Sequence, residues 1–213
     1  MNAIKIFKTV LPFAAIVLLS GCPAVPPRSL EQPEELAVHG AYLHKGSNIK
    51  LPESVGVFQR EMLTRYDANG LDVSAGYDLV TPSNHIAATV YVYPAPRLVS
   101  IGSPPDVIAE AKAHLAESEF ERRQREIHQV HPDAMLIEQH DTVRTEDGLS
   151  YPGKMAIYEY EDLFAGSRQI LRSELYVFCY IGGKWAVEYR ITRPKAEQAD
   201  QQIQQFIDNW NWY

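Results

Sequence analysis

The chain has 213 residues, of which 46% are hydrophobic and 22% are charged. These proportions are typical of globular proteins and exclude a chain that is disordered along most of its length. The formal net charge of −7 opposes binding to a phosphate backbone, so nucleic acid is not an expected partner.

Residues 1–21 contain the parts of a secretory signal. Lys5 and Lys8 supply positive charge, residues 10–19 form an apolar run, and small residues precede Cys22. The run of about ten residues is too short for a permanent transmembrane helix, which needs about 20.

The stretch 18–22, Leu-Leu-Ser-Gly-Cys, resembles a bacterial lipobox. The resemblance implies that Cys22 becomes the first residue of the mature protein and carries diacylglyceryl and N-acyl chains. Several acyl chains give lasting membrane attachment, at about 0.8 kcal/mol per buried methylene group. In Gram-negative lipoproteins, Asp at the next position is linked to retention in the inner membrane, so Pro23 favours the outer membrane. An ordinary cleaved signal followed by an unrelated cysteine is the alternative.

Removal of Lys5 and Lys8 would leave 18 basic residues against 27 acidic ones, a formal charge of 18 − 27 = −9. Such a body is repelled by anionic lipids, so we expect the acyl chains alone to anchor it. Residues 22–35 then form the lipidated cysteine and a Pro-rich tether, which is extended at about 3.1 Å per residue where it adopts polyproline geometry. Residues 36–213 are expected to form a single α+β periplasmic domain.

Alternating hydrophobicity predicts three strands in the first half of this domain, near residues 54–66, 73–79 and 86–92. Between the first two strands, Asn69-Gly70 predicts a two-residue hairpin turn, because both residues tolerate positive φ. Residues 81–84, Thr-Pro-Ser-Asn, predict the second turn.

A long helix is predicted next, with Ser103 as its N-cap and Pro132 beyond its end. Its apolar stripe would consist of Ile108, Ala111, Leu115, Phe120, Ile127 and Val130. Its solvated face would carry Glu117, Glu119, Glu121, Arg122, Arg123 and Arg125.

Four more strands are predicted after this helix, near residues 134–144, 153–163, 168–181 and 184–193. Gly182-Gly183 predicts a hairpin between the last two. A final helix is expected to open at Pro194 and to place Ile203, Phe206, Ile207 and Trp210 on one face. Consecutive hairpins imply antiparallel pairing, so the predicted class is α+β, with about seven strands and the long and C-terminal helices packed on the sheet.

This order of elements, with the segments 154–160 and 172–178, resembles the PsbP-like family of small lumenal and periplasmic proteins. The resemblance covers residues 45–212. It implies an accessory or binding role, because the family is mostly non-enzymatic, and it provides no catalytic residues.

Few residues point to chemistry. Cys179 lies in an apolar strand pattern and is expected to be a core residue, not a nucleophile. Neither a Gly-x-Ser-x-Gly elbow nor a phosphate-binding loop is present in the sequence, so no catalytic residue and no cofactor is predicted.

His128 and His131 share a helical face, and His140 follows in the next strand. This spacing permits a metal site. The alternative is that the first two histidines interact favourably with the helix C-terminus.

Two further groups of residues suggest contact surfaces. Trp212 and Tyr213 would either cap the core or form an aromatic contact for a partner. Arg172, Glu174, Glu188 and Arg190 are expected on an exposed sheet face, as a cross-strand charge ladder or as a contact surface.

The function predicted from these features is a membrane-anchored, non-catalytic binding or assembly module of the cell envelope, with an envelope protein as its partner. One alternative is a metal-dependent hydrolase with a site formed by His128, His131 and His140. Another is a carrier of lipophilic ligands, with a pocket between sheet and helix.

Overall fold

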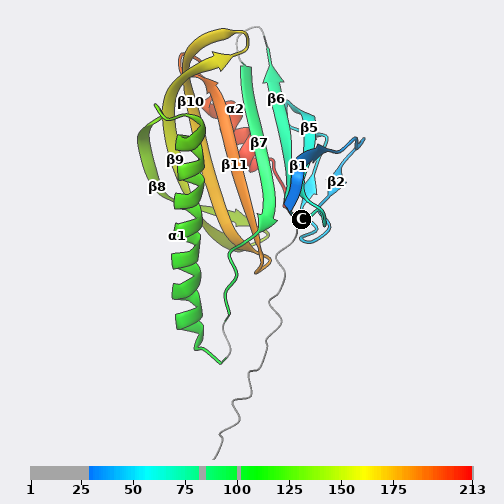
Figure 1. Cartoon of the computed structure of the whole chain (residues 1–213), viewed down its shortest axis with the longest axis vertical. Helices are drawn as coiled ribbons and strands as arrows, with labels where there is room; N and C mark the ends of the chain where they lie inside the picture. Colours follow the sequence, from blue (N-terminus) through cyan, green and yellow to red (C-terminus); the bar gives the residue numbers. More distant parts are fainter. Residues whose placement is uncertain (1–28, 82–84, 100–101, 213) are drawn as a thin grey trace, which may run out of the picture.

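The computed structural model describes residues 29–81, 85–99 and 102–212. These residues form an α+β fold, a large antiparallel sheet with one helix on each face (Figure 1). The elements are β1 (Ser29–Glu35), β2 (Tyr42–Leu43), β3 (Lys50–Leu51), β4 (Ser54–Val55), β5 (Phe58–Asp67), β6 (Val73–Val80), β7 (His85–Pro94), α1 (Pro105–Val130), β8 (Met135–Glu146), β9 (Leu149–Phe164), β10 (Ser167–Ile181), β11 (Trp185–Pro194) and α2 (Asp200–Asp208).

The main sheet has the strand order β1-β5-β6-β7-β11-β10-β9-β8, and β4 adds a short pairing to β5. It therefore has nine strands within the described residues, more than the seven predicted, although the class is confirmed. The additional strands are β1 and β4, while β2 and β3 form a separate two-stranded ribbon.

Strand β1 lies within the segment 22–35 that we predicted to be a tether. Glu34 pairs with Arg65 and Glu35 pairs with Thr64 of β5, so at least residues 29–35 belong to the sheet. An edge strand tolerates Pro33 because one of its sides needs no backbone donor. The remainder of that segment, including Cys22, lies outside the described residues.

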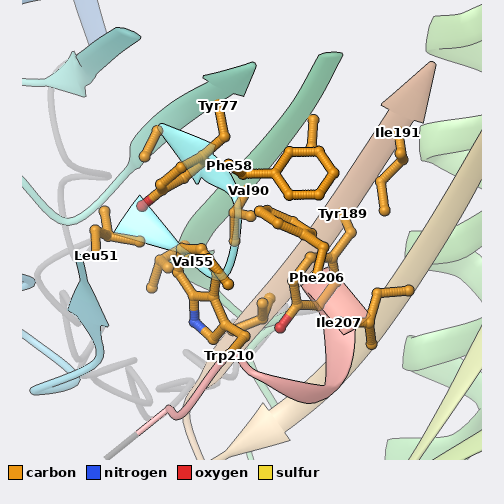
Figure 2. Packing of buried hydrophobic residues seen from close by; sticks show 14 of the residues in the cluster. Leu51, Val55, Phe58, Tyr77, Val90, Tyr189, Ile191, Phe206, Ile207 and Trp210 are labelled. Carbon is orange, nitrogen blue, oxygen red and sulfur yellow. The ribbon is translucent and has the colours of Figure 1, made fainter. Parts of the chain in front are cut away.

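The two faces of the sheet carry separate cores. Along β11, Val187, Tyr189 and Ile191 pack in the core that contains α2, whereas Ala186 packs in the core that contains α1. Because successive side chains of a strand point to opposite faces, the two helices cover opposite sides of the sheet. Figure 2 shows the α2 side, where the ring of Phe206 lies 4.6 Å from Phe58 between ring centroids.

Helix α2 has the predicted buried face, since Ile203, Phe206, Ile207 and Trp210 are all buried. The predicted start at Pro194 is wrong. Pro194 instead ends β11, where it pairs with Leu171, and the helix begins at Asp200. A proline supplies no backbone N–H, which makes a strand end as suitable for it as a helix start.

Helix α1 has the predicted extent but not the predicted cap or faces. Its N-cap residue is Pro104, with no side-chain hydrogen bond, so Ser103 does not cap it. Only Glu119, Phe120 and Ile127 are buried, because the N-terminal part of α1 projects beyond the sheet (Figure 1). The predicted apolar stripe is imperfect for this reason.

The first hairpin connection lies where predicted but is wider. Residues 68–72 connect β5 to β6, and the carboxylate of Asp67 accepts hydrogen bonds from the backbone N–H groups of Asn69, Leu71 and Asp72 at 2.7–3.1 Å. Gly70 has positive φ, and Asn69 does not. A carboxylate that binds three loop amides thus replaces the predicted two-residue turn. The predicted turn at 81–84 lies mostly outside the described residues.

Candidate functional site

A recess of about 220 Å³ lies between the C-terminal end of α1 and the sheet. Its wall is formed by Ile127, Val130 and His131. Its floor comes from four strands and consists of Ala87 and Thr89 of β7, Tyr160 of β9, Ser173 of β10, and Arg190 and Thr192 of β11. We call it the α1 groove.

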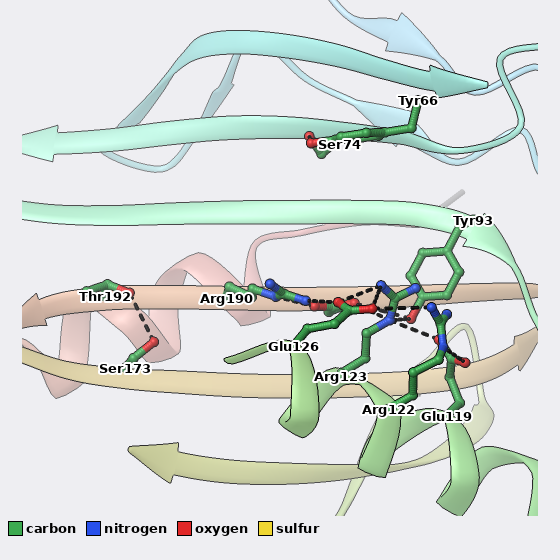
Figure 3. A network of polar contacts seen from close by, with 11 residues as sticks. Tyr66, Ser74, Tyr93, Glu119, Arg122, Arg123, Glu126, Ser173, Arg190 and Thr192 are labelled. Atoms are coloured by element: carbon green, nitrogen blue, oxygen red, sulfur yellow. Dashed lines mark hydrogen bonds and ion pairs between the residues drawn. The ribbon is translucent and has the colours of Figure 1, made fainter. Parts of the chain in front are cut away.

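Strand register assembles the floor from distant parts of the chain. Thr192 pairs with Ser173 on one side and with Ala87 on the other, while Arg190 pairs with Thr89. Most of these side chains are small, which leaves space beside the helix. The hydroxyls of Ser173 and Thr192 lie 3.0 Å apart and share a hydrogen bond (Figure 3).

A cluster of six charged residues joins α1 to β11 next to the groove (Figure 3). It consists of Glu119, Arg122, Arg123, Glu126, Glu188 and Arg190. At its centre, the fully buried Glu188 contacts Arg123 at 3.1 Å and accepts hydrogen bonds from Tyr93 and Arg190. The guanidinium of Arg123 also stacks over the Tyr93 ring, 4.1 Å from its centroid.

Neighbouring guanidinium groups favour the ionised forms of Glu119 and Glu126. Burial alone would raise the pKa of Glu119, but the hydrogen bond from Arg122 and the charge of Arg123 outweigh it and lower the pKa. The pKa of Glu126 is lowered in the same way, since Arg123 and Arg190 outweigh the effect of burial. The cluster contains three Arg and three Glu side chains, so their formal charges sum to zero.

Arg190 belongs to both the cluster and the groove. Its Nη2 lies 2.8 Å from Glu126, its Nε donates to Glu188, and the guanidinium lies over the ring of Tyr91. Within the described residues, Nη1 of Arg190 and the hydroxyl of Thr89 make no hydrogen bond. Both remain available to a ligand in the groove.

The three predicted metal-binding histidines do not come together. The ring of His131 stacks on Tyr160, with centroids 3.9 Å apart, and the ring of His128 meets Tyr158 edge-on. His140 alternates along β8 with Asp141, which points toward α1 because its partner Lys154 also contacts Glu117. His140 therefore points to the opposite face of the sheet.

Across the described ranges, no group of three His, Cys, Asp or Glu side chains could hold a metal ion.

Trp212 is fully buried, so its side chain caps the core and offers no exposed surface to a partner. Its Nε1–H donates to the hydroxyl of Tyr189 at 2.8 Å, and its ring packs edge-on against Phe178. Tyr213 lies outside the described residues. Cys179 is buried as predicted, and burial raises the pKa of its thiol to about 12.

The four residues predicted to form an exposed charge ladder do not share a face of the sheet. Glu174 pairs with Ile191 on the α2 side, whereas Glu188 and Arg190 contact α1 on the other side. Glu174 and Glu188 are also buried, so the predicted ladder is wrong. Glu119 and Arg123, which were assigned to the solvated helix face, lie against β11 instead. Alternating polar residues in a strand do not indicate whether a helix packs on that face of the sheet. The one sequence signal was the concentration of Arg and Glu between residues 119 and 126.

A second recess, of about 370 Å³, lies between α2 and β8. Arg144 lines this recess. Its guanidinium group donates to the carbonyls of Ile207 and Trp210 and stacks over the ring of Trp212. These contacts cap the end of α2. This recess is larger than the α1 groove, but the guanidinium of Arg144 is already bonded to the end of α2. The α1 groove is therefore the better candidate for a binding site.

Neither helix within the described ranges is long and apolar enough to cross a membrane. No protein-family model matches the sequence, and no curated protein is significantly similar to it.

Proposed function

We propose that this protein is a lipid-anchored binding module of the bacterial cell envelope. Acyl chains on Cys22 hold it at a membrane, with the outer membrane favoured, and the domain binds its target through the α1 groove. The observation that carries the proposal is the groove itself, a recess with a rigid sheet floor and unused hydrogen-bonding groups on Thr89 and Arg190.

The position of the groove supports this function. Ser29 pairs with Asp67, at the end of the sheet where β5 leads into β6. The groove lies toward the other end, where Ala87 pairs with Thr192 and Val80 pairs with His85. The groove residues Thr89 and Ala87 pair with Gly76 and Asp78, which lie three to five residue steps, or about 10–17 Å, along β6 from Val73. An anchor that precedes β1 would therefore leave the groove facing away from the membrane.

Binding is favoured over hydrolysis by the contacts inside the groove. Ser173, His131 and nearby Asp162 are the residue types of a catalytic triad, but the hydroxyl of Ser173 bonds to Thr192. No hydrogen bond joins Ser173 to His131, and Nδ1 of His131 lies 3.6 Å from Asp162. A nucleophile needs contact with its base, which this arrangement does not supply.

A PsbP-like relationship belongs to the same proposal, and it rests on the order of elements and on the segments 154–160 and 172–178. The lipophilic carrier is less well supported, because both recesses have polar groups in their walls.

Site-specific photo-cross-linking in intact cells tests the proposal. A benzophenone amino acid replaces Val130, a groove-wall residue that is 70% exposed. As the matched control it replaces Val57, which follows β4 and is 58% exposed. We expect a covalent adduct at Val130 that is absent at Val57 and is lost when Thr89→Trp fills the groove. Equal labelling at both positions, or no adduct while a known envelope complex is captured, would contradict it.

A further inference from the structure

We infer that the α1 groove binds an uncharged, polyhydroxylated ring, the chemistry of a neutral saccharide unit. The inference rests on the proposed function and specifies its ligand. The groove's size is the first observation: about 220 Å³ is smaller than the roughly 300–1,000 Å³ of pockets that enclose drug-sized ligands. A single ring fits this scale better than an extended lipid or a folded peptide.

The charge balance favours an uncharged ligand. Arg190, the cluster member that lines the groove, is 25% exposed and lies 2.8 Å from Glu126, which is 31% exposed. An anion that approached Arg190 would meet Glu126, and a cation that approached Glu126 would meet Arg190. Because each charge is already compensated, either ion would leave an unpaired charge in a half-buried place.

The hydrogen-bonding groups on the floor match a ring that carries several hydroxyls. The hydroxyls of Thr89, Ser173 and Thr192 can each act as donor and acceptor. The single bond between Ser173 and Thr192 leaves further capacity on both. Nη1 of Arg190 adds a donor that no described residue uses. Each hydroxyl of a saccharide can donate and accept a hydrogen bond, so it can bond to these three hydroxyls and to the guanidinium of Arg190.

Apolar surfaces face the same space. Ile127 and Val130 line the wall, and the stacked rings of His131 and Tyr160 close one end. A pyranose has a face of C–H groups as well as a rim of hydroxyls, so it can contact these side chains without loss of its hydrogen bonds.

The surface continues from the groove across β7, β6 and β5. Tyr91 and Tyr66 are half-buried there, with ring centroids 6.2 Å apart, and the hydroxyl of Tyr66 lies 3.1 Å from that of Ser74 (Figure 3). Gly76 of β6 pairs with Thr89 of the groove floor, so no side chain of β6 projects beside Thr89. A second ring of a short glycan can therefore lie on the two tyrosines.

Saturation-transfer NMR on the full chain in detergent micelles tests the ligand class. Three pyranoses of one size serve as probes: N-acetylglucosamine, which is neutral, glucosamine, which is cationic, and galacturonate, which is anionic. We expect the neutral sugar to bind in the range of about 1–10 mM and each charged sugar to bind at least about tenfold more weakly. Tightest binding of galacturonate would overturn the charge argument, and with it the inference.

Matched variants locate the binding. Thr89→Val and Ser173→Ala keep the floor shape but remove hydroxyls, and we expect each to weaken binding of N-acetylglucosamine at least about fivefold with an unchanged Tm. Thr145→Val, on β8 beside the other recess, serves as the control and should bind as the wild type does. Equal weakening in all three variants, or no change in the first two, would overturn the inference.

The two proposals can fail separately. If none of the three sugars shows saturation transfer while the Val130 cross-link persists, the saccharide inference falls and the binding function stands. If the cross-link is also absent, both fall.

Discussion

At the residue scale, the most unusual group is the carboxylate of Glu188, a charge with no solvent exposure. Removing an ion from water costs several kcal/mol, which is recovered only when its partners are well placed. Arg123, Arg190 and Tyr93 supply these partners. Their contacts fix the position of α1 on β11, and this position defines the groove wall.

Glu188→Ala should strongly destabilise the fold. It leaves Arg123 and Arg190 without their buried partner, and we expect a loss of about 3–5 kcal/mol in the free energy of unfolding. Urea titration measures this loss. Glu121→Ala, which removes an exposed carboxylate 3.8 Å from Arg125 on the same helix, is the control and should cost less than about 1 kcal/mol. Equal stability of the two variants would show that the cluster does not hold α1.

Asp72 should make stability depend on pH in the opposite sense to an ordinary carboxylate. Burial raises its pKa to about 6, with the charges of Asp67 and Glu188 adding to the effect and that of Arg123 opposing it. The folded state then favours the protonated form. The contribution of this group is fully present below its unfolded pKa of about 3.9 and is lost as the pH rises toward 6.

We therefore expect Asp72→Asn to be more stable than the wild type at pH 7, by about 1–2 kcal/mol, and equally stable near pH 4. Thermal unfolding at the two pH values measures the difference. A constant difference across this range would mean that the carboxyl of Asp72 does not titrate as described.

At the scale of elements, the C-terminal end of α2 is held by side-chain hydrogen bonds from β8. Arg144 of β8 donates to the carbonyls of Ile207 and Trp210, and Glu146 accepts the backbone N–H of Trp212. These contacts join the end of α2 to an edge strand that lies far from it in the sequence.

Arg144→Met should loosen this junction. It keeps a long apolar side chain but removes the guanidinium donor to the Trp210 carbonyl and one donor to the Ile207 carbonyl, which keeps the N–H of Trp210. We expect a cost of about 1–3 kcal/mol. Hydrogen exchange of the α2 amides should accelerate, and urea titration gives the magnitude. Arg168→Met removes an exposed guanidinium 3.7 Å from Glu161 and should change neither quantity appreciably. Slow exchange in the Arg144 variant would contradict the role of this contact.

The sequence predicted elements whose signal is local. Strands β6 and β7 follow from plain alternation, and the buried face of α2 follows from helical spacing. Strand β1 was missed because its Pro-rich composition is typical of a tether and only pairing with β5 makes it a strand. The groove was missed because its floor depends on the register of four strands. The burial of Glu188 depends on where α1 crosses the sheet.

At the scale of the whole molecule, the proposed function requires an anchor that precedes β1, whose first residue lies at one end of the sheet, and a groove toward the other end. β1 begins at Ser29, which pairs with Asp67, and the α1 groove opens near the start of β7 and the end of β11. Under the proposed function, such a domain would present its groove to the periplasmic space. The acidic chain makes direct adsorption to anionic lipid unfavourable, so the proposed function depends on a covalent anchor.

The lipid anchor is the central claim, and Cys22→Ser tests it most directly. Cells that express the wild type or the variant are labelled with radioactive palmitate and then partitioned with detergent. We predict that the wild type takes up label and enters the detergent phase, whereas the variant takes up none and stays in the aqueous phase, with at least about a tenfold change in partition. A Cys22→Ser protein that still takes up palmitate and still fractionates with the membrane would contradict the account.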